Sequence, residues 1–237
     1  MTRPPVWLVG AALAAGAWLA RGAVTRSDPV AERARTPSGM VYVEAGSFLM
    51  GSDDADADPD VKPRRAVTLR AYYMDRTEVT HADYARVVTG HRFDAADAAR
   101  PITHLTRDEA AAFLARIGKR LPTTAEWERA ARGTDGRRYP WGDEPPTARH
   151  LHLGEVLKTK PPKASTMCAL PRTEAVGLYP AGVSPVGCLD MAGNAWEWVA
   201  DDYSESPPRQ IIRGGAFGYH ERFLRCYAFS IEDAGVT

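Results

Sequence analysis

Apolar and polar positions alternate in two stretches between residues 40 and 80, which is typical of strands that bury one face. The stretch MVYVEAGSFLMGS (residues 40–52) alternates and then stops at a Gly-Ser pair. This pattern predicts a hairpin with its turn at Ala45-Gly46. The stretch AVTLRAYYMDRTEVT (residues 66–80) alternates β-branched and aromatic residues with polar ones, and it predicts a further strand.

Three helices are predicted after these strands, because each has a capping signal, an apolar face and a glycine stop. The capping signals are threonine–acid pairs with capping-box spacing: Thr80 with Asp83, Thr106 with Glu109 and Thr123 with Glu126. The stops are Gly90, Gly118 and Gly133. Residues 134–187 are rich in proline and show no sustained period, so loops are expected there.

The third of these helices carries one large apolar residue among several charged ones. Trp127 is expected in the core. Glu126, Glu128 and Arg129 are expected to cap the helix or to form surface pairs.

The acidic stretch DDADADPD (residues 53–60) has the charge of a calcium loop. Counted from Asp54, however, the sixth position is Pro59 and the twelfth is Arg65, where an EF-hand loop needs glycine and glutamate. A solvated acidic loop is therefore the better interpretation.

The N-terminus combines an arginine with an apolar run from Val6 to Ala20. The run has the length of the apolar part of a signal peptide and is short for a membrane span. We expect residues 1–23 to be an export signal, cleaved or kept as a membrane anchor, that places the protein in the periplasm or anchors it facing outside the cytoplasm. A buried N-terminal helix is the alternative. Residues 24–38 are expected to be a polar linker to a domain at 39–237.

The composition is that of a globular protein. The 237 residues suit one large domain or one domain with extensions, and 44% of them are hydrophobic. The 30 Lys and Arg residues balance 30 Asp and Glu residues without a basic stripe, so no nucleic-acid partner is expected. The cysteines, Cys168, Cys188 and Cys226, allow at most one disulfide, and their spacing fits no zinc motif.

The stretch GNAWEW (residues 193–198) places Glu197 between two tryptophans, directly after a glycine and an asparagine. A carboxylate among such large apolar neighbours needs a partner if it is buried. From the residues alone, Glu197 could cap a helix or pair with an arginine such as Arg213.

Four stretches, in this order, carry a family resemblance: RLPTTAEWERAARG (120–133), YPWGDE (139–144), GCLDMAGNAWEWVADDY (187–203) and IIRGGAFGY (211–219). Together they resemble the formylglycine-generating enzyme family, also called the sulfatase-modifying factor family, and the resemblance covers about residues 40–230. It implies an α+β domain related to C-type lectins, with little regular secondary structure.

The resemblance implies a calcium site at the stretch that contains Glu197. In the family the matching segment wraps a calcium ion, so the implied ligands are the side chains of Asp190 and Glu197 and the backbone carbonyls of Gly193 and Ala195. The family often has asparagine where this chain has Asp190, and the change keeps an oxygen ligand and adds charge. Hard oxygen donors around a bend that glycine permits suit calcium.

The chain departs from the family at the catalytic centre. The family's enzymes oxidise a sulfatase cysteine to formylglycine with molecular oxygen and a copper(I) ion held by two thiolates, which suit this soft metal. The matching positions here are Tyr219 and Leu224, and Ala216 replaces a serine that the active enzymes use. The chain also ends without the family's closing Gly-Phe-Arg motif, so we expect a domain shortened at its C-terminus.

Histidines could supply a different redox metal. His150 and His152 form an H-x-H pair, and His220 lies beside a lost cysteine position. Three imidazoles could hold iron, copper or zinc if the fold brought them together. The alternative, that all three lie on loop surfaces, is the one we expect.

Two functions of different class follow from these residues. The first is a non-catalytic, calcium-stabilised binding domain in the cell envelope, a pseudoenzyme whose former substrate groove near Trp196, Tyr219 and His220 binds a protein segment or a sugar. The second is a metal-dependent oxidoreductase, with copper or iron, that acts on a protein or thiol substrate such as a sulfatase cysteine. The lost cysteine pair favours the first.

Overall fold

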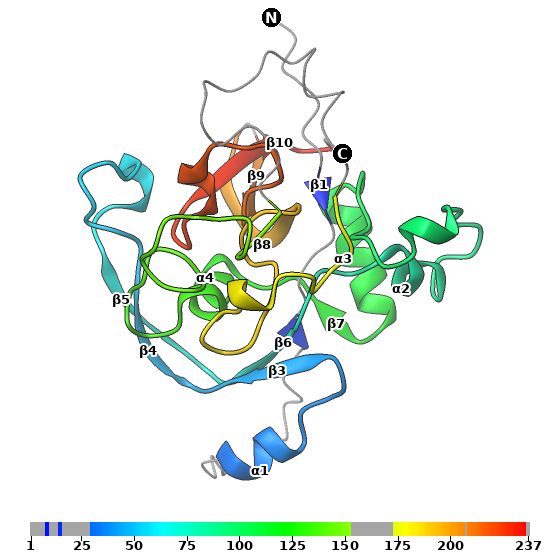
Figure 1. Cartoon of the computed structure of the whole chain (residues 1–237), viewed down its shortest axis with the longest axis horizontal. Coiled ribbons are helices and arrows are strands. Elements are labelled where there is room, and N and C mark those ends of the chain that lie inside the picture. The colour runs from blue at the N-terminus through cyan, green and yellow to red at the C-terminus, as the bar shows by residue number, and fades with distance from the viewer. Residues whose placement is uncertain (1–7, 10–13, 16–28, 153–172, 207, 236–237) are drawn as a thin grey trace, which may run out of the picture.

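The computed structural model describes residues 8–9, 14–15, 29–152, 173–206 and 208–235 (Figure 1). The helices are α1 (Pro29–Ala34), α2 (His81–Ala85), α3 (Arg107–Arg116) and α4 (Thr124–Arg132). The strands are β1 (Leu8–Val9), β2 (Ala14–Ala15), β3 (Met40–Val43), β4 (Gly46–Met50), β5 (Arg65–Leu69), β6 (Tyr72–Asp75), β7 (Lys119–Arg120), β8 (Trp196–Glu205), β9 (Pro208–Arg213) and β10 (Phe229–Asp233). Short 3-10 turns cover Pro59–Val61, Ala95–Asp97, Pro180–Gly182 and Glu221–Leu224. The predicted α+β class is confirmed.

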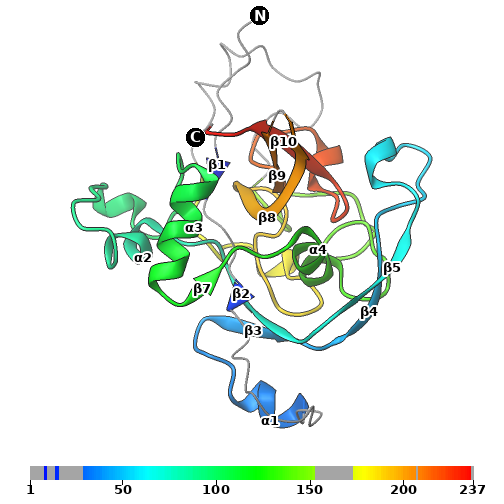
Figure 2. The same ribbon diagram turned by 180° about the vertical axis from the view of Figure 1, so that it is seen from behind.

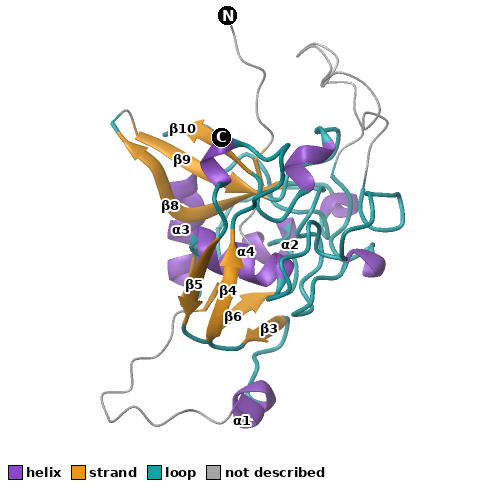
Figure 3. Ribbon diagram, turned by 90° about the vertical axis from the view of Figure 1, so that its left-hand side faces the viewer, coloured by secondary structure: helices purple, strands orange, loops and turns teal. Residues whose placement is uncertain are grey.

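The strands form three small sheets. One has the order β1-β8-β9-β10, the second β3-β6-β2-β7, and the third is the pair β4-β5. Figure 3 shows these strands gathered on one side of the molecule and the loops on the other. In the first sheet β8 runs antiparallel to β9, with Glu197 opposite Arg213 and Trp198 opposite Ile212.

The predicted hairpin at residues 40–52 is wrong in its turn. Strand β3 pairs with β6, so that Val43 lies opposite Tyr72, and β4 pairs with β5, so that Gly46 lies opposite Leu69. The two pairs form one long bent ribbon whose tip is the acidic loop, and Gly46, with a φ of 152°, lies at the bend. The predicted strand at residues 66–80 is two shorter strands and ends before Thr80.

The three predicted capping boxes are confirmed. In each, the threonine hydroxyl accepts the backbone N–H of the acid three residues later, and that acid accepts the backbone N–H of the threonine. Helix α4 ends at Gly133, whose φ of 67° lies in the left-handed region that glycine favours. Helix α2 is shorter than its pattern predicts, because it ends at Ala85, ahead of Gly90.

The core lies on both faces of β8, between α3 and α4 (Figure 2). On one face, Trp196 and Trp198 pack with Phe113 and Leu114 of α3. On the other face, Val199 packs with Trp127 of α4, which is fully buried as predicted. Because successive strand residues point to opposite faces, Glu197 shares the face of Val199 and points toward α4.

The N-terminal segment is described only in part. Strand β1 pairs in parallel with β8, and β2 lies between β6 and β7. In the described stretches of the chain, we find no helix long and apolar enough to cross a membrane. Within the predicted linker, α1 lies near the second sheet, where the Tyr73 hydroxyl donates a hydrogen bond to Glu32 Oε2 at 2.8 Å.

Candidate metal centre

Glu197 has an indole as a partner. The Trp127 Nε1–H donates a hydrogen bond to Glu197 Oε2 at 2.7 Å, and Glu197 is only 1% exposed. Because Glu197 lies inside strand β8, the helix-cap interpretation is wrong. The Arg213 guanidinium forms its ion pair with Glu128 Oε2, at 3.2 Å. The WEW pattern is therefore a strand with tryptophans on one face and a buried carboxylate on the other.

The loop before β8 has an unusual backbone. Asp190, Gly193 and Asn194 have φ values of 57°, 84° and 52°. Two of these residues are not glycine, and such conformations are uncommon and cluster at functional sites. Glycine is favoured at position 193 by its positive φ, and a β-carbon there would also displace the end of the Leu151 side chain, whose Cδ1 would lie 2.7 Å away.

The loop holds the Asp190 carboxylate inward. Asp190 Oδ2 accepts the Gly177 N–H at 2.6 Å, and the residue is 8% exposed. Burial raises the pKa of Asp190 to about 6, against the smaller opposing effect of that hydrogen bond. A desolvated carboxylate held inside the molecule is stabilised by a neighbouring cation.

A third buried carboxylate, Glu78, lies near the same loop. Its Oε2 accepts a hydrogen bond from Asn194 Nδ2 at 3.2 Å, and its buried Oε1 has no partner. Burial, and then the negative charges of Asp190 and Glu197, raise the pKa of Glu78 well above its usual range. Glu78 could not be found from the sequence, because a single glutamate in RTEVT has no spacing signal and only the fold brings it to Asn194.

These donors fit calcium better than a transition metal. The carboxylates influence one another electrostatically, but within the described part of the chain no three His, Cys, Asp or Glu side chains converge on one point. A cation here would therefore need backbone oxygens, as the implied set does. The carbonyl oxygen of Ala195 faces Gly214, where a β-carbon would lie 3.8 Å from it. Two carboxylates plus carbonyls form a hard donor set.

The positions implied for copper are apolar or aromatic. Leu224 is 2% exposed and packs with Tyr139, Leu151 and Ala192. The Tyr219 ring lies edge-on to Trp196, with ring centroids 5.4 Å apart. Neither side chain is a soft ligand, and Ala216 beside them is buried without a hydroxyl.

The structure separates the residues expected to line a groove. Trp196 is 1% exposed and belongs to the core, whereas Tyr219 is half-buried and His220 is exposed. Tyr219 and His220 are therefore the members of this set that can reach a ligand from the surface. The groove itself stays a prediction.

Each of the three candidate histidines has its own surroundings. His150 stacks on Trp141, with centroids 4.6 Å apart, and His220 Nδ1 accepts the Arg222 N–H at 3.2 Å. His152 is half-buried: its Nδ1 lies 3.5 Å from Glu174 Oε1, and its buried Nε2 has no hydrogen-bond partner. No group of three convergent ligands forms among the described histidines and acids.

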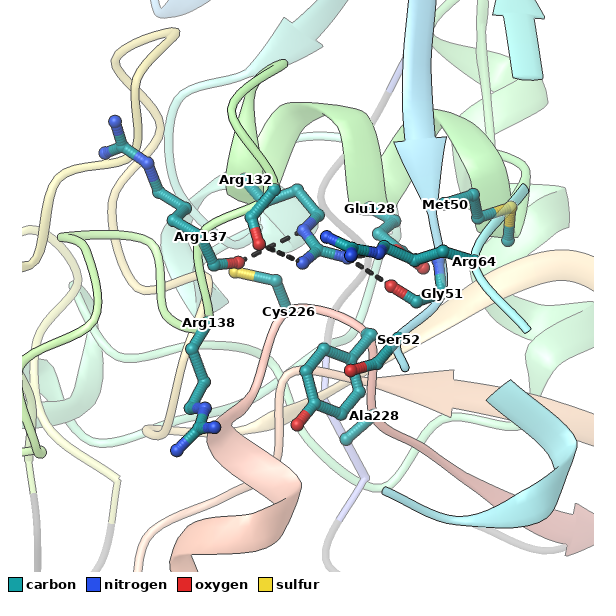
Figure 4. Close-up of polar contacts among 12 residues, drawn as sticks. Met50, Gly51, Ser52, Arg64, Glu128, Arg132, Arg137, Arg138, Cys226 and Ala228 are labelled. Atoms are coloured by element: carbon teal, nitrogen blue, oxygen red, sulfur yellow. Dashed lines mark hydrogen bonds and ion pairs between the residues drawn. The ribbon is translucent and has the colours of Figure 1, made fainter. Parts of the chain in front are cut away.

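A second charged centre was missed by the sequence analysis. Glu128, expected at the surface, is 1% exposed and forms ion pairs with Arg132 at 3.0 Å and Arg213 at 3.2 Å. Arg132 also donates to the carbonyl oxygens of Gly51 at 2.7 Å and Arg137 at 3.1 Å (Figure 4). The four-residue spacing of Glu128 and Arg132 next to a core tryptophan was the available signal.

Two cysteines lie buried near these centres. Cys188 and Cys226 are both free, and burial raises the pKa of each thiol far above its usual range. Figure 4 shows Cys226 close to Arg132 and Arg137. Such thiols are poor nucleophiles and poor metal ligands. Cys168 lies outside the described residues.

The acidic loop is exposed but anchored. Asp54 accepts hydrogen bonds from Arg138 at 2.9 Å and from the Tyr227 hydroxyl at 2.8 Å. Asp56 pairs with Arg225 at 2.6 Å. The aspartates of this loop, which connects β4 and β5, therefore hold the tip of the ribbon against the body of the protein. This agrees with the sequence-based interpretation that the loop is not an EF-hand calcium site.

Comparison with known proteins supports the sequence resemblance. The family profile described as "Sulfatase-modifying factor enzyme 1-like domain" matches residues 26–236. The chain belongs to the formylglycine-generating enzyme family. It is 31% identical to the formylglycine-generating enzyme of Thermomonospora curvata over 263 aligned residues, which cover 80% of this chain and 86% of that protein.

Other members of the formylglycine-generating enzyme family extend the comparison. The chain is 26% identical to "Inactive C-alpha-formylglycine-generating enzyme 2" of Mus musculus, over 75% of this chain and 74% of that protein. Among solved structures, PvdO from Pseudomonas aeruginosa aligns with a TM-score of 0.64 at 23% identity, over 83% of this chain and 88% of that one. The family fold predicted from the sequence is therefore confirmed.

Proposed function

We propose that this member of the formylglycine-generating enzyme family is a non-catalytic binding domain that calcium stabilises. The observation that carries the proposal is the pair Tyr219 and Leu224, which stand where the family resemblance implies copper-binding cysteines. Neither offers a thiolate, and Leu224 is buried among apolar side chains. The mouse relative named as inactive indicates that the family includes proteins without the activity.

Calcium is the proposed cofactor, held by Asp190, Glu197 and the carbonyls of Gly193 and Ala195. Supporting this are the inward carboxylate of Asp190, the buried Glu197 and the positive φ values that shape the loop. When bound, the ion would neutralise carboxylates that are otherwise desolvated. The role of the ion in this proposal is to stabilise the fold.

The test of the calcium proposal is thermal unfolding of the full chain with calcium and with a chelator. Saturating calcium adds about 2.7 kcal/mol at one hundred times its Kd, which is about 5–10 °C in Tm for a domain of this size. Glu197→Gln should abolish the response. Asp202→Asn changes a half-exposed carboxylate on the same strand and should keep it. Identical melting curves for the parent with and without calcium would reject the proposal.

The absence of catalysis has its own test. The full chain, loaded separately with copper and iron, is incubated in air with a sulfatase peptide that carries the Cys-x-Pro-x-Arg motif, and the peptide is followed by mass spectrometry. We expect no conversion to the aldehyde while circular dichroism shows a folded protein. Conversion would support an oxidoreductase instead.

One observation favours that second candidate, a metal-dependent oxidoreductase acting on a protein or thiol. His152 has a buried Nε2 without a partner, and its other ring nitrogen lies near the Glu174 carboxylate. An imidazole backed by a carboxylate is typical of metal ligands. Stoichiometric copper or iron after purification, lost in His152→Ala, would favour this candidate over the first.

We further propose an envelope location and a protein segment or sugar as the ligand of the surface around Tyr219 and His220. The location rests on the apolar run from Val6 to Ala20. A fusion of residues 1–38 to a reporter that is active only outside the cytoplasm should be active. An inactive fusion, made in normal amounts, would contradict export.

A further inference from the structure

Arg129 differs from the other buried arginines of this protein. It is 9% exposed and its Nε is buried without a hydrogen-bond partner. Within the described part of the chain, its side chain forms no ion pair, in contrast to Arg132, Arg213 and Arg225, each of which pairs with a carboxylate. A buried, unpaired guanidinium is costly, so an external anion is the natural partner.

The side chain of Arg129 borders a cavity of about 430 Å³. This volume lies in the range of small-molecule sites, about 300–1,000 Å³. Residues two apart on a helix point to nearly opposite sides, about 200° apart. Arg129 therefore faces away from Trp127, and the cavity is separate from the candidate metal centre.

The lining of the cavity indicates the class of ligand. Met40, Val41 and Val186 supply the apolar part of the lining, and polar atoms form the larger part. The other charged residues, Arg33 and Glu44, form an ion pair with each other at 2.9 Å. Their charges cancel, so Arg129 leaves one net positive charge. A ligand with one anionic group and an apolar body complements this lining. The second negative charge of a dianion would have no cation to pair with and would lie near the Glu44 carboxylate.

We infer that this cavity binds a monocarboxylate with an apolar body, and that the carboxylate pairs with Arg129. The guanidinium presents two parallel donors that match a carboxylate. The inference does not depend on the calcium site or on whether the protein is catalytic.

The experiment measures binding of hexanoate to the full chain by calorimetry or NMR titration, with hexanamide as the uncharged match and inorganic phosphate as the competing anion. Charge-assisted hydrogen bonds contribute about 1.5–3 kcal/mol, so hexanamide should bind about 10- to 100-fold more weakly than hexanoate. Arg129→Met should lose affinity for hexanoate by the same factor. Arg116→Met, which changes an exposed arginine outside the cavity, should keep it.

Arg129→Met should melt at or above the temperature of the parent, because it removes an unpaired buried charge. If this variant fails to fold, the comparison of hexanoate with hexanamide on the parent still decides. Equal binding of hexanoate and hexanamide, no binding of either, or retention of hexanoate binding by folded Arg129→Met would overturn the inference. Tighter binding of phosphate than of hexanoate would overturn the carboxylate assignment.

Discussion

Two buried charged centres lie on either side of Trp127, and they balance their charges differently. The arginine centre consists of Glu128, Arg132 and Arg213, and its ion pairs are internal. The carboxylate centre consists of Glu78, Asp190 and Glu197, and no ion pair between described residues includes Glu78 or Asp190. The first centre is complete as the chain folds, whereas in the second Glu78 and Asp190 have no ion-pair partner among the described residues and need a cation or protons to balance them.

The hydrogen-bond partners of the charged side chains explain the difference between the two centres. The two arginines of the first centre also donate to backbone carbonyl oxygens: Arg213 Nη1 donates to those of Cys226 at 3.2 Å and Ala228 at 3.3 Å. In the second centre, the Asp190 carboxylate accepts the Gly177 N–H and the Glu78 carboxylate accepts the Asn194 amide, while Glu78 Oε1 has no hydrogen-bond partner. Ionised carboxylates with so few donors are undersatisfied when buried.

The largest expected effect comes from breaking the arginine centre. Glu128→Leu leaves two buried guanidiniums without their carboxylate and should lower the free energy of unfolding by about 3–5 kcal/mol. Urea unfolding followed by circular dichroism measures the loss. Asp135→Ala, which breaks the exposed pair with Arg137, is the control and should cost less than about 1 kcal/mol. A loss of stability in Glu128→Leu no larger than in this control would show that Glu128 does not neutralise the two buried guanidiniums.

The stability that the carboxylate centre contributes should fall as pH rises, whereas the stability from a carboxylate in an ion pair falls as pH drops. The pKa of Asp190 is about 6 in the folded protein, above its usual value of 3.8. Its stabilising contribution is therefore fully present below pH 3.8 and is lost as pH rises through about 6, by roughly 2–3 kcal/mol in the metal-free protein. Burial shifts the pKa of Glu78 in the same direction.

Calcium should reverse this trend, because only ionised carboxylates bind the ion well. The increase in Tm caused by calcium should be larger at pH 7.5 than at pH 5, as measured by melting in calcium and in chelator at both values. Asp190→Asn should flatten the pH dependence of the chelated protein. Equal calcium responses at the two pH values would argue that Asp190 is not part of the site.

Trp127→Phe tests the connection between the two centres. Trp127 donates to Glu197 with its indole N–H, and the Arg213 guanidinium lies 5.6 Å from its ring centroid. The variant keeps an aromatic ring but leaves a buried carboxylate without this donor, which should cost about 2 kcal/mol. Calcium should restore part of the loss by binding Glu197. Urea unfolding with and without calcium measures both effects. Equal losses of stability in the two conditions would mean that calcium does not compensate for the lost Trp127–Glu197 hydrogen bond.

The contrast between the centres also separates what the sequence could predict from what it could not. The capping boxes of α2, α3 and α4 and the burial of Trp127 follow from local rules and are confirmed. The turn at Ala45-Gly46 is wrong because β3 pairs with β6 and β4 pairs with β5, and these partner strands come later in the chain, beyond the acidic loop.

The burial and the pairing of charged residues were harder to predict from the sequence. Glu128 has the same spacing to Arg132 as a surface pair on any helix, so only the packing of α4 shows it to be buried. Asp190 and Glu197 were found through the family resemblance, and Glu78 was not, because its approach to Asn194 joins segments 116 residues apart. Sequence patterns record local geometry, and the neutralisation of buried charge is settled by tertiary contacts.

The smallest expected effect is also the most specific for a cation. Glu78→Gln preserves the shape of the side chain and an oxygen that can accept from Asn194, while it removes a buried charge whose Oε1 has no partner. In chelator at pH 7.5 the variant should be more stable than the parent by about 1 kcal/mol. In calcium this gain should shrink or disappear, because the ionised Glu78 then attracts the nearby ion. Melting temperatures in the two conditions decide: the same shift in both would mean that Glu78 senses no cation, and that protons alone balance the carboxylate centre.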